Sequence, residues 1–98
     1  MTFRLRFKPE AEDRLNNLKN DRSQQAQYKA VLKCLGFLET NRRHPSLHTH
    51  EFTSMKGQNN EKVYTAYAQQ NRPAAYRVFW HYGPKEREIT IITITPHL

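Results

Sequence analysis

The sequence predicts an α+β domain, with the elements in the order strand, helix, helix, strand, strand, strand. We expect an N-terminal strand, a two-helix hairpin and a three-stranded antiparallel meander, with both helices on one face of a four-stranded sheet. The 98 residues are enough for one domain with a single core, spanning residues 1–98. Only 37% of them are hydrophobic, which suits a thin core between two layers. Apolar residues alternate in some segments and recur at helical spacing in others, which separates strands from helices.

The first segment predicts a strand followed by a helix. Residues 2–7 alternate between apolar and basic side chains, as in a half-buried strand. Pro9 then takes the first helical position, and the acidic residues Glu10, Glu12 and Asp13 fall in the first turn, where the helix dipole favours anions. We therefore expect a helix over residues 9–19.

A second helix is predicted by an apolar stripe between Tyr28 and Leu38, with Asp21 or Ser23 as its cap. The short link between the two helices predicts a hairpin that covers one face of the sheet. The single cysteine, Cys34, lies in this helix and cannot form an internal disulfide. We expect it to be a small buried side chain.

Residues 41–62 show no periodicity and are rich in Asn, Pro, Ser, Gly and basic residues. We expect a long irregular segment, which in a compact domain is uncommon unless it is functional or disordered. Its cationic and titratable residues are Arg42, Arg43, His44, His48, His50 and Lys56.

The last third of the chain predicts a strand at residues 63–68, and then a hairpin of strands at residues 76–82 and 89–95. Alternation places Tyr76, Val78 and Trp80 on one face of the sheet. If that face packs on the core, Arg77 lies on an open face. The face of Arg77 also carries Phe79 and His81, and His97 follows the last strand.

The charge of the chain favours an anionic partner. Lys and Arg number 16 against 9 Asp and Glu, which gives a net charge of +7. Such an excess is typical of nucleic-acid binding and equally fits an acidic protein partner. The N-terminus lacks a signal peptide, and no segment is long and apolar enough to cross a membrane, so we expect a cytoplasmic protein with no membrane partner.

The histidines and glycines do not form a known metal or cofactor motif. His44, His48 and His50 lack the spacing of a zinc finger, and the chain has no His-Glu-x-x-His motif. It also lacks a phosphate-cradling Gly-rich loop and a nucleophile elbow. We therefore expect neither a metal nor a cofactor. The histidines are either solvated loop residues or phosphate contacts and proton carriers.

Arg77 and the aromatic residues on its face each have two interpretations. Arg77 is either a functional cation or an ordinary solvated or salt-bridged arginine. Phe79 and His81 either stack on bases, as in single-stranded nucleic-acid sites, or cover the sheet. His97 taken alone is a surface histidine.

Three local patterns together resemble the RelE/ParE family of bacterial toxins. Met55-Lys56-Gly57 before the strand of Tyr64 resembles a hydrophobic-basic-Gly step into a strand in that family. The run from Tyr76 to Trp80 resembles its Tyr-Arg-apolar-x-aromatic strand. The Ile/Thr-rich last strand before His97 resembles members that finish with a catalytic His or Tyr. The order of elements also agrees over nearly the full length.

This resemblance implies a toxin of a type II toxin–antitoxin system that cleaves mRNA on the ribosome without metal and so inhibits translation. Arg77 would stabilise the phosphate with Lys56 as a second cation, and His97 would act as general acid or base. His48 or His50 would be the other proton carrier. RNA would be bound through Arg42, Arg43, Lys62, Lys85 and Arg87, with Phe79 and His81 stacking on bases.

The resemblance also leaves alternatives. Some members have a second arginine next to a tyrosine after the last strand, and this sequence does not. The family includes DNA gyrase inhibitors with the same fold, so the chain could instead bind gyrase, or be a non-toxic nucleic-acid-binding domain. Either kind of toxin implies a cognate antitoxin with an acidic or amphipathic segment.

Overall fold

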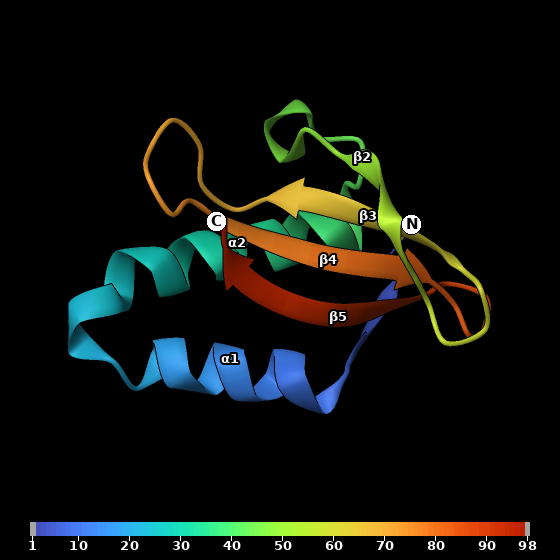
Figure 1. Cartoon of the computed structure of the whole chain (residues 1–98), viewed down its shortest axis with the longest axis horizontal. Coiled ribbons are helices and arrows are strands. Elements are labelled where there is room, and N and C mark those ends of the chain that lie inside the picture. Colours follow the sequence, from blue (N-terminus) through green and yellow to red (C-terminus); the bar gives the residue numbers. More distant parts are fainter. Residues whose placement is uncertain (1, 98) are drawn as a thin grey trace.

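Five strands form one mixed sheet, and two helices pack against one of its faces (Figure 1). The computed structural model describes residues 2–97. The elements are β1 (Arg4–Phe7), α1 (Pro9–Lys19), α2 (Gln25–Thr40), β2 (His50–Lys56), β3 (Lys62–Tyr67), β4 (Tyr76–Tyr82) and β5 (Glu88–Pro96). Short 3₁₀ turns at Arg22–Gln24 and Pro45–Leu47 precede α2 and β2. The strand order is β1-β5-β4-β3-β2, with β1 parallel to β5 and the other pairs antiparallel.

The predicted α+β architecture is confirmed, with five strands in place of four. The additional strand, β2, lies within residues 41–62, which we expected to be irregular. It is an edge strand with a register irregularity between Glu51 and Lys56, and none of its residues is buried. Since no regular face of β2 packs on the core, its sequence carries no alternation that would identify it.

α1 begins where the sequence predicts, whereas α2 begins at Gln25, after a 3₁₀ turn, and has no side-chain cap of its own. α1 has Pro9 in its first turn and spans residues 9–19 as expected. The Asp21 carboxylate accepts hydrogen bonds from the Ser23 backbone N–H and hydroxyl at 2.9 and 2.6 Å, so it caps the 3₁₀ turn that leads into α2. These bonds, the Ser23 hydroxyl first, hold the pKa of Asp21 below its usual range. Neither helix within residues 2–97 has the length and apolar character needed to cross a bilayer.

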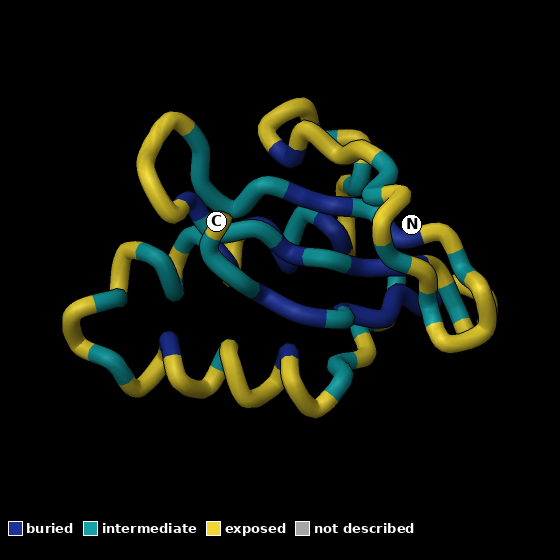
Figure 2. Tube along the Cα trace, viewed as in Figure 1, coloured by how far each residue is buried: buried dark blue, intermediate teal, exposed yellow. Residues whose placement is uncertain are grey.

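The core lies between the helices and the sheet (Figure 2). Its largest side chain is Trp80, which is buried together with Val78 on β4, as alternation predicts. On β5 the core residues are Ile89, Ile91 and Ile94. Ile89 and Ile91 are two residues apart, whereas Ile91 and Ile94 are three apart, because β5 has one extra residue at this point. Phe79 of β4 pairs with Thr93, but the next residue, Trp80, pairs with Ile91. The irregularity keeps all three isoleucines on the helix side.

The other face of the sheet is only partly open. The β2–β3 hairpin crosses toward β1, where Lys8 Nζ donates a hydrogen bond to Gln58 Oε1 at 3.1 Å. Near this hairpin Val63 is fully buried, although it does not belong to the main core. The open face that we expected is therefore restricted to the end of the sheet where β3 ends and β4 begins.

Candidate functional site

Arg77 lies at this uncovered end of the sheet, on the face away from the helices. It pairs with Tyr67 on β3 and with Thr95 on β5. Its guanidinium carbon lies 4.3 Å from the centre of the Tyr67 ring, a cation–π contact. Within residues 2–97 no carboxylate forms a salt bridge with Arg77, and its buried Nε has no acceptor. The arginine is held by an aromatic ring and retains its charge for a ligand.

Two histidines approach the same tyrosine, His48 from the end of the 3₁₀ turn and His50 from the first position of β2. The rings of His48 and His50 lie 5.7 and 5.9 Å from the Tyr67 ring, centre to centre. Tyr67 therefore connects both histidines to Arg77. The structure thus brings three of the predicted catalytic residues around one ring.

The hydrogen bond made by His50 determines which of its nitrogens can accept a proton. Its Nδ1 lies 2.9 Å from the backbone carbonyl oxygen of His48, and a carbonyl oxygen only accepts. Nδ1 therefore carries the hydrogen, and the neutral ring has its lone pair on Nε2. His50 is in the tautomer that allows Nε2 to act as a base.

The segment that carries His48 is fixed to the rest of the fold. Leu47 is buried in the core, and the Gln70 side chain donates a hydrogen bond to the Ser46 carbonyl oxygen at 2.8 Å. His48 itself has φ of 44°, in the left-handed region that few side chains adopt without cost. These two anchors, in the residues directly before His48, sustain its strained backbone beside Tyr67.

His97 lies on the other side of Arg77. Its backbone N–H donates to the Ala75 carbonyl oxygen at 2.8 Å, which extends the β4–β5 ladder beyond Pro96. Strand alternation from Thr95 places its exposed side chain on the same sheet face as Arg77. In strand order, Arg77 lies between His97 and the β2 histidines.

Lys56 is separated from this group. It pairs with Lys62 at the beginning of β3, whereas Arg77 pairs with Tyr67 at its end, roughly 16 Å away along the strand. Its amine also lies 3.8 Å from a carboxylate oxygen of Glu51. The structure does not bring Lys56 together with Arg77 as a second cation.

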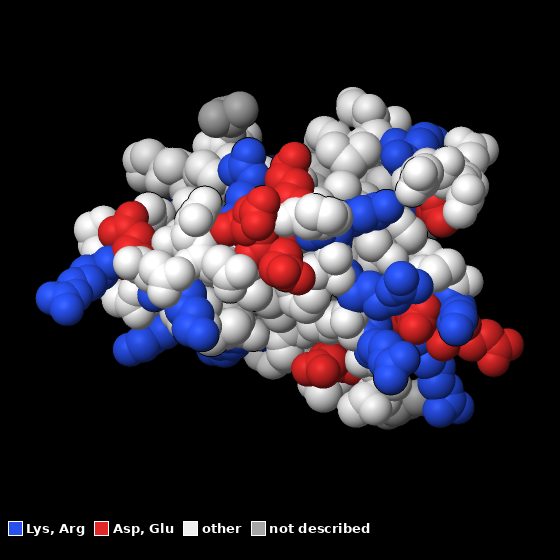
Figure 3. All heavy atoms as spheres, turned by 90° about the horizontal axis from the view of Figure 1, so that it is seen from below, with Lys and Arg blue, Asp and Glu red and all other residues white. Residues whose placement is uncertain are grey.

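Other predicted RNA contacts gather at the same distant end of the sheet. Lys62, Lys85 and Arg87 are exposed at or near the two hairpin turns. Figure 3 shows the largest group of basic side chains on the visible face at this right-hand end. Lys62, Lys85 and Arg87 thus lie at the opposite end of the strands from Arg77.

The aromatic residues on the face of Arg77 differ in access. Phe79 is half-buried and packs edge-on against Phe52, with ring centres 5.0 Å apart. His81 is only 4% exposed, and its Nδ1 lies 2.7 Å from the Tyr82 carbonyl oxygen. The structure does not present His81 for stacking on a base, because its side chain is buried and lines a cavity of about 230 Å³ together with Gln58 and Asn59 of the β2–β3 hairpin.

Cys34 is 2% exposed, as the sequence predicts, and burial raises the pKa of its thiol to about 12. A buried, protonated thiol is a poor nucleophile, and Cys34 packs in the hydrophobic core. Among residues 2–97, no three His, Cys, Asp or Glu side chains converge where they would bind a metal ion.

Tyr67 is the residue of the site that the sequence did not reveal. Tyr64 lies in the same strand and Tyr76 begins the next one, so the sequence alone does not distinguish Tyr67 from these other tyrosines. What distinguishes it is the register that pairs it with Arg77. Only the pairing of β3 with β4 would have identified it.

Comparison with known proteins gives structural neighbours only. No family model matches the sequence, and neither does any curated protein. The RelE–RelB complex of Pyrococcus horikoshii contains a chain with TM-score 0.65 and 20% identity, covering 98% of this chain and 96% of that one. The YoeB dimer of Staphylococcus aureus gives 0.64 and 13%, covering both chains completely. A YoeB/ParE toxin of Agrobacterium tumefaciens gives 0.63 and 10%, covering 97% and 99%.

The three structural similarities extend over essentially the whole chain, and the matched proteins belong to three different organisms. They agree with the order of strands and helices and with the resemblance that the sequence predicts. This chain therefore has the same fold as the matched chains of the RelE–RelB complex, the YoeB dimer and the YoeB/ParE toxin.

Proposed function

We propose that this chain is the toxin of a type II toxin–antitoxin system, and that it cleaves mRNA on the ribosome without metal. The observation that carries the proposal is Arg77, a cation with no carboxylate partner in residues 2–97, which lies against the same Tyr67 ring that His48 and His50 approach. The fold shared with three toxins supports the same class.

The reaction transfers a phosphoryl group within the RNA. The 2′-oxygen of one ribose attacks the adjacent phosphorus, and the bond from phosphorus to the 5′-oxygen of the next nucleotide breaks. The products are a 2′,3′-cyclic phosphate and a 5′-hydroxyl. A base must take the proton of the 2′-hydroxyl, an acid must give a proton to the leaving 5′-oxygen, and a cation must stabilise the charge on the phosphorane.

The strand order suits this division of roles. We assign the base to Nε2 of His50, whose tautomer leaves that nitrogen free, and the acid to His97. Arg77 stabilises the phosphorane between them, since β4 lies between β5 and the strands that carry Tyr67 and His50. A base and an acid on opposite sides of the phosphorus match the in-line geometry of the reaction.

An antitoxin partner follows from the charge of the chain. A net charge of +7 and exposed cations at the hairpin turns favour a partner with an acidic segment. One structural neighbour is the toxin of a RelE–RelB complex. We expect expression of the chain alone to arrest growth, and co-expression with its antitoxin to restore growth.

Cleavage on translating ribosomes tests the proposal. The purified protein is added to a translation reaction, and new mRNA 3′ ends are mapped. Arg77→Ala and His50→Ala should each lower the cleavage rate by about 10²-fold or more. Arg22→Ala, an exposed arginine at the link between the helices, is the matched control and should cleave normally. Absence of cleavage by the unaltered protein, or full cleavage by Arg77→Ala, would refute the proposal.

A second candidate is inhibition of DNA gyrase by binding. It is favoured by the third neighbour, which is described as a YoeB/ParE toxin and shares the fold equally well. Loss of gyrase supercoiling activity on addition of stoichiometric protein, with no mRNA cleavage, would support this function over the first. Unhindered growth on expression of the chain alone would instead indicate a non-toxic nucleic-acid-binding domain.

A further inference from the structure

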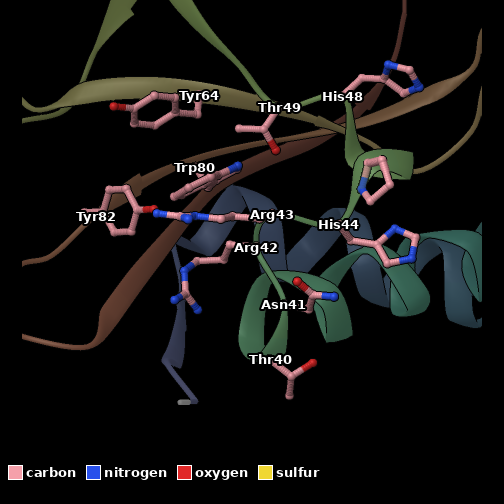
Figure 4. Close-up of a pocket in the computed structure, with 11 residues that line it drawn as sticks. Thr40, Asn41, Arg42, Arg43, His44, His48, Thr49, Tyr64, Trp80 and Tyr82 are labelled. Carbon is pink, nitrogen blue, oxygen red and sulfur yellow. The ribbon is translucent and has the colours of Figure 1, made fainter.

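We propose that a pocket on the helix side of the sheet binds one nucleotide of single-stranded RNA. This edge pocket has a volume of about 680 Å³, within the usual range of ligand sites. It is lined by residues 40–45, His48, Thr49, Tyr64, Trp80 and Tyr82. Figure 4 shows the three aromatic side chains on one side and the segment after α2 on the other.

The edge pocket is distinct from the Arg77 group because it opens on the opposite face of the sheet. Tyr64 pairs with Trp80, and both belong to or pack on the core beneath the helices. Tyr67 and Arg77, which pair three residues further along, point to the other face.

The lining charges favour an anion. The eleven lining residues include Arg42 and Arg43 and contain no Asp or Glu. Neither arginine forms a salt bridge within the part of the chain that the structure describes. Arg42 is held in place, with its guanidinium carbon 3.6 Å from the Phe3 ring centre and a hydrogen bond to the Leu38 carbonyl oxygen. Arg43 is exposed and available to bind a phosphate.

The aromatic side of the pocket favours a base. Trp80 lies 5.0 Å from Tyr64 and 4.9 Å from Tyr82, centre to centre, so the three rings form one cluster. Tyr82 is 46% exposed and therefore accessible for stacking, whereas Trp80 is 1% exposed and supports the Tyr82 ring from the core. Trp80 Nε1 is buried and has no acceptor within residues 2–97. In Figure 4 this nitrogen points toward Thr49, another lining residue.

An aromatic cluster beside arginines that have no carboxylate partner in residues 2–97 is the combination that single-stranded nucleic-acid sites use. An acidic peptide would satisfy the arginines but not the stacking surface. His48 lines the edge pocket and also lies 5.7 Å from the Tyr67 ring, so one RNA strand that crosses the sheet edge would reach both places. The inference rests on RNA binding in the proposed function but not on cleavage.

Trp80 is the only tryptophan of the chain and therefore reports on the edge pocket directly. The fluorescence of the full chain is titrated with a single-stranded uridylate trimer. Arg43→Gln is compared with Arg22→Gln, which removes the same charge at the other end of α2, about 24 Å away. We expect Arg43→Gln to weaken binding about tenfold and Arg22→Gln less than about twofold. Tyr82→Phe should retain affinity and Tyr82→Leu should lose it.

Three results would overturn the inference. The first is no change in Trp80 fluorescence, and the second is equal weakening by Arg43→Gln and Arg22→Gln. The third is a response to a hexaglutamate peptide that the trimer does not displace, which would assign the pocket to an acidic protein. Arg77→Ala separates this site from catalysis, because it should abolish cleavage yet preserve the Trp80 response. Loss of the response in Arg77→Ala would mean that the trimer binds on the other face.

Discussion

Replacement of Tyr67 by leucine tests whether its ring holds Arg77 ready for the phosphate. The guanidinium carbon lies 4.3 Å from the ring centre, and the half-buried arginine has no anionic partner in residues 2–97. A cation–π contact contributes from about 0.5–1 kcal/mol when exposed to about 2 kcal/mol when desolvated. Arg77 lies between these limits, since its Nε is buried, so we take about 1–2 kcal/mol.

If the contact orients Arg77 in the transition state, Tyr67→Leu should lower kcat/KM for mRNA cleavage by roughly 5- to 30-fold. The loss should fall mainly on kcat, because the ring acts on the arginine and not on distant RNA contacts. Tyr67→Phe preserves the ring face and should retain most of the activity. The assay is single-turnover cleavage on ribosomes stalled at a defined codon.

Thermal unfolding of both variants controls for damage to β3. Equal losses in Tyr67→Phe and Tyr67→Leu would refute the role of the ring and point to the hydroxyl. Full activity in Tyr67→Leu would show that Arg77 needs no support from this ring.

Three further predictions follow from the site and the core. His97→Ala should lower the rate of mRNA cleavage by about 10²-fold, the usual effect of removing a general acid, in the single-turnover assay on stalled ribosomes. The Cys34 thiol should not react with a thiol reagent at pH 8 until urea unfolds the chain. Burial raises the pKa of this thiol from 9.0 to about 12, so above pH 9 the thiol ionises more readily in the unfolded chain than in the folded one. The free energy of unfolding should therefore be unaffected by this group below pH 9 and should fall as the pH rises toward 12. Ile94→Ala should lower the free energy of unfolding by about 2–5 kcal/mol in urea titrations, because Ile94 is fully buried.

The sequence predicts the elements whose side chains alternate or recur against the core. Pro9 and the first-turn carboxylates identify α1, and Val78 and Trp80 identify the buried face of β4. β2 escapes prediction because it is an irregular edge strand whose exposed and half-buried residues follow no regular alternation.

The site is less predictable than the fold because it depends on pairing across strands. Arg77 is conspicuous in sequence as a charge within an aromatic strand, but Tyr67 gains its role only from the register between β3 and β4. His81 shows the converse, since alternation places it on the face of Arg77 while a distant hairpin buries it. Such coverage depends on long-range contacts that no local pattern encodes.

The position of β5 in the sheet has a consequence for synthesis of the protein. This strand is the last in sequence but lies between β1 and β4, and it supplies three core isoleucines. The sheet cannot close, and β1 has no partner, until residues 88–96 are available. Contacts of such large sequence separation form late and slowly. His97 follows directly after this strand, so its place opposite Ala75 is set in the same final step. A nascent chain that lacks β5 thus carries Arg77 without its β5 neighbour, and the complete site arises only when the last strand inserts.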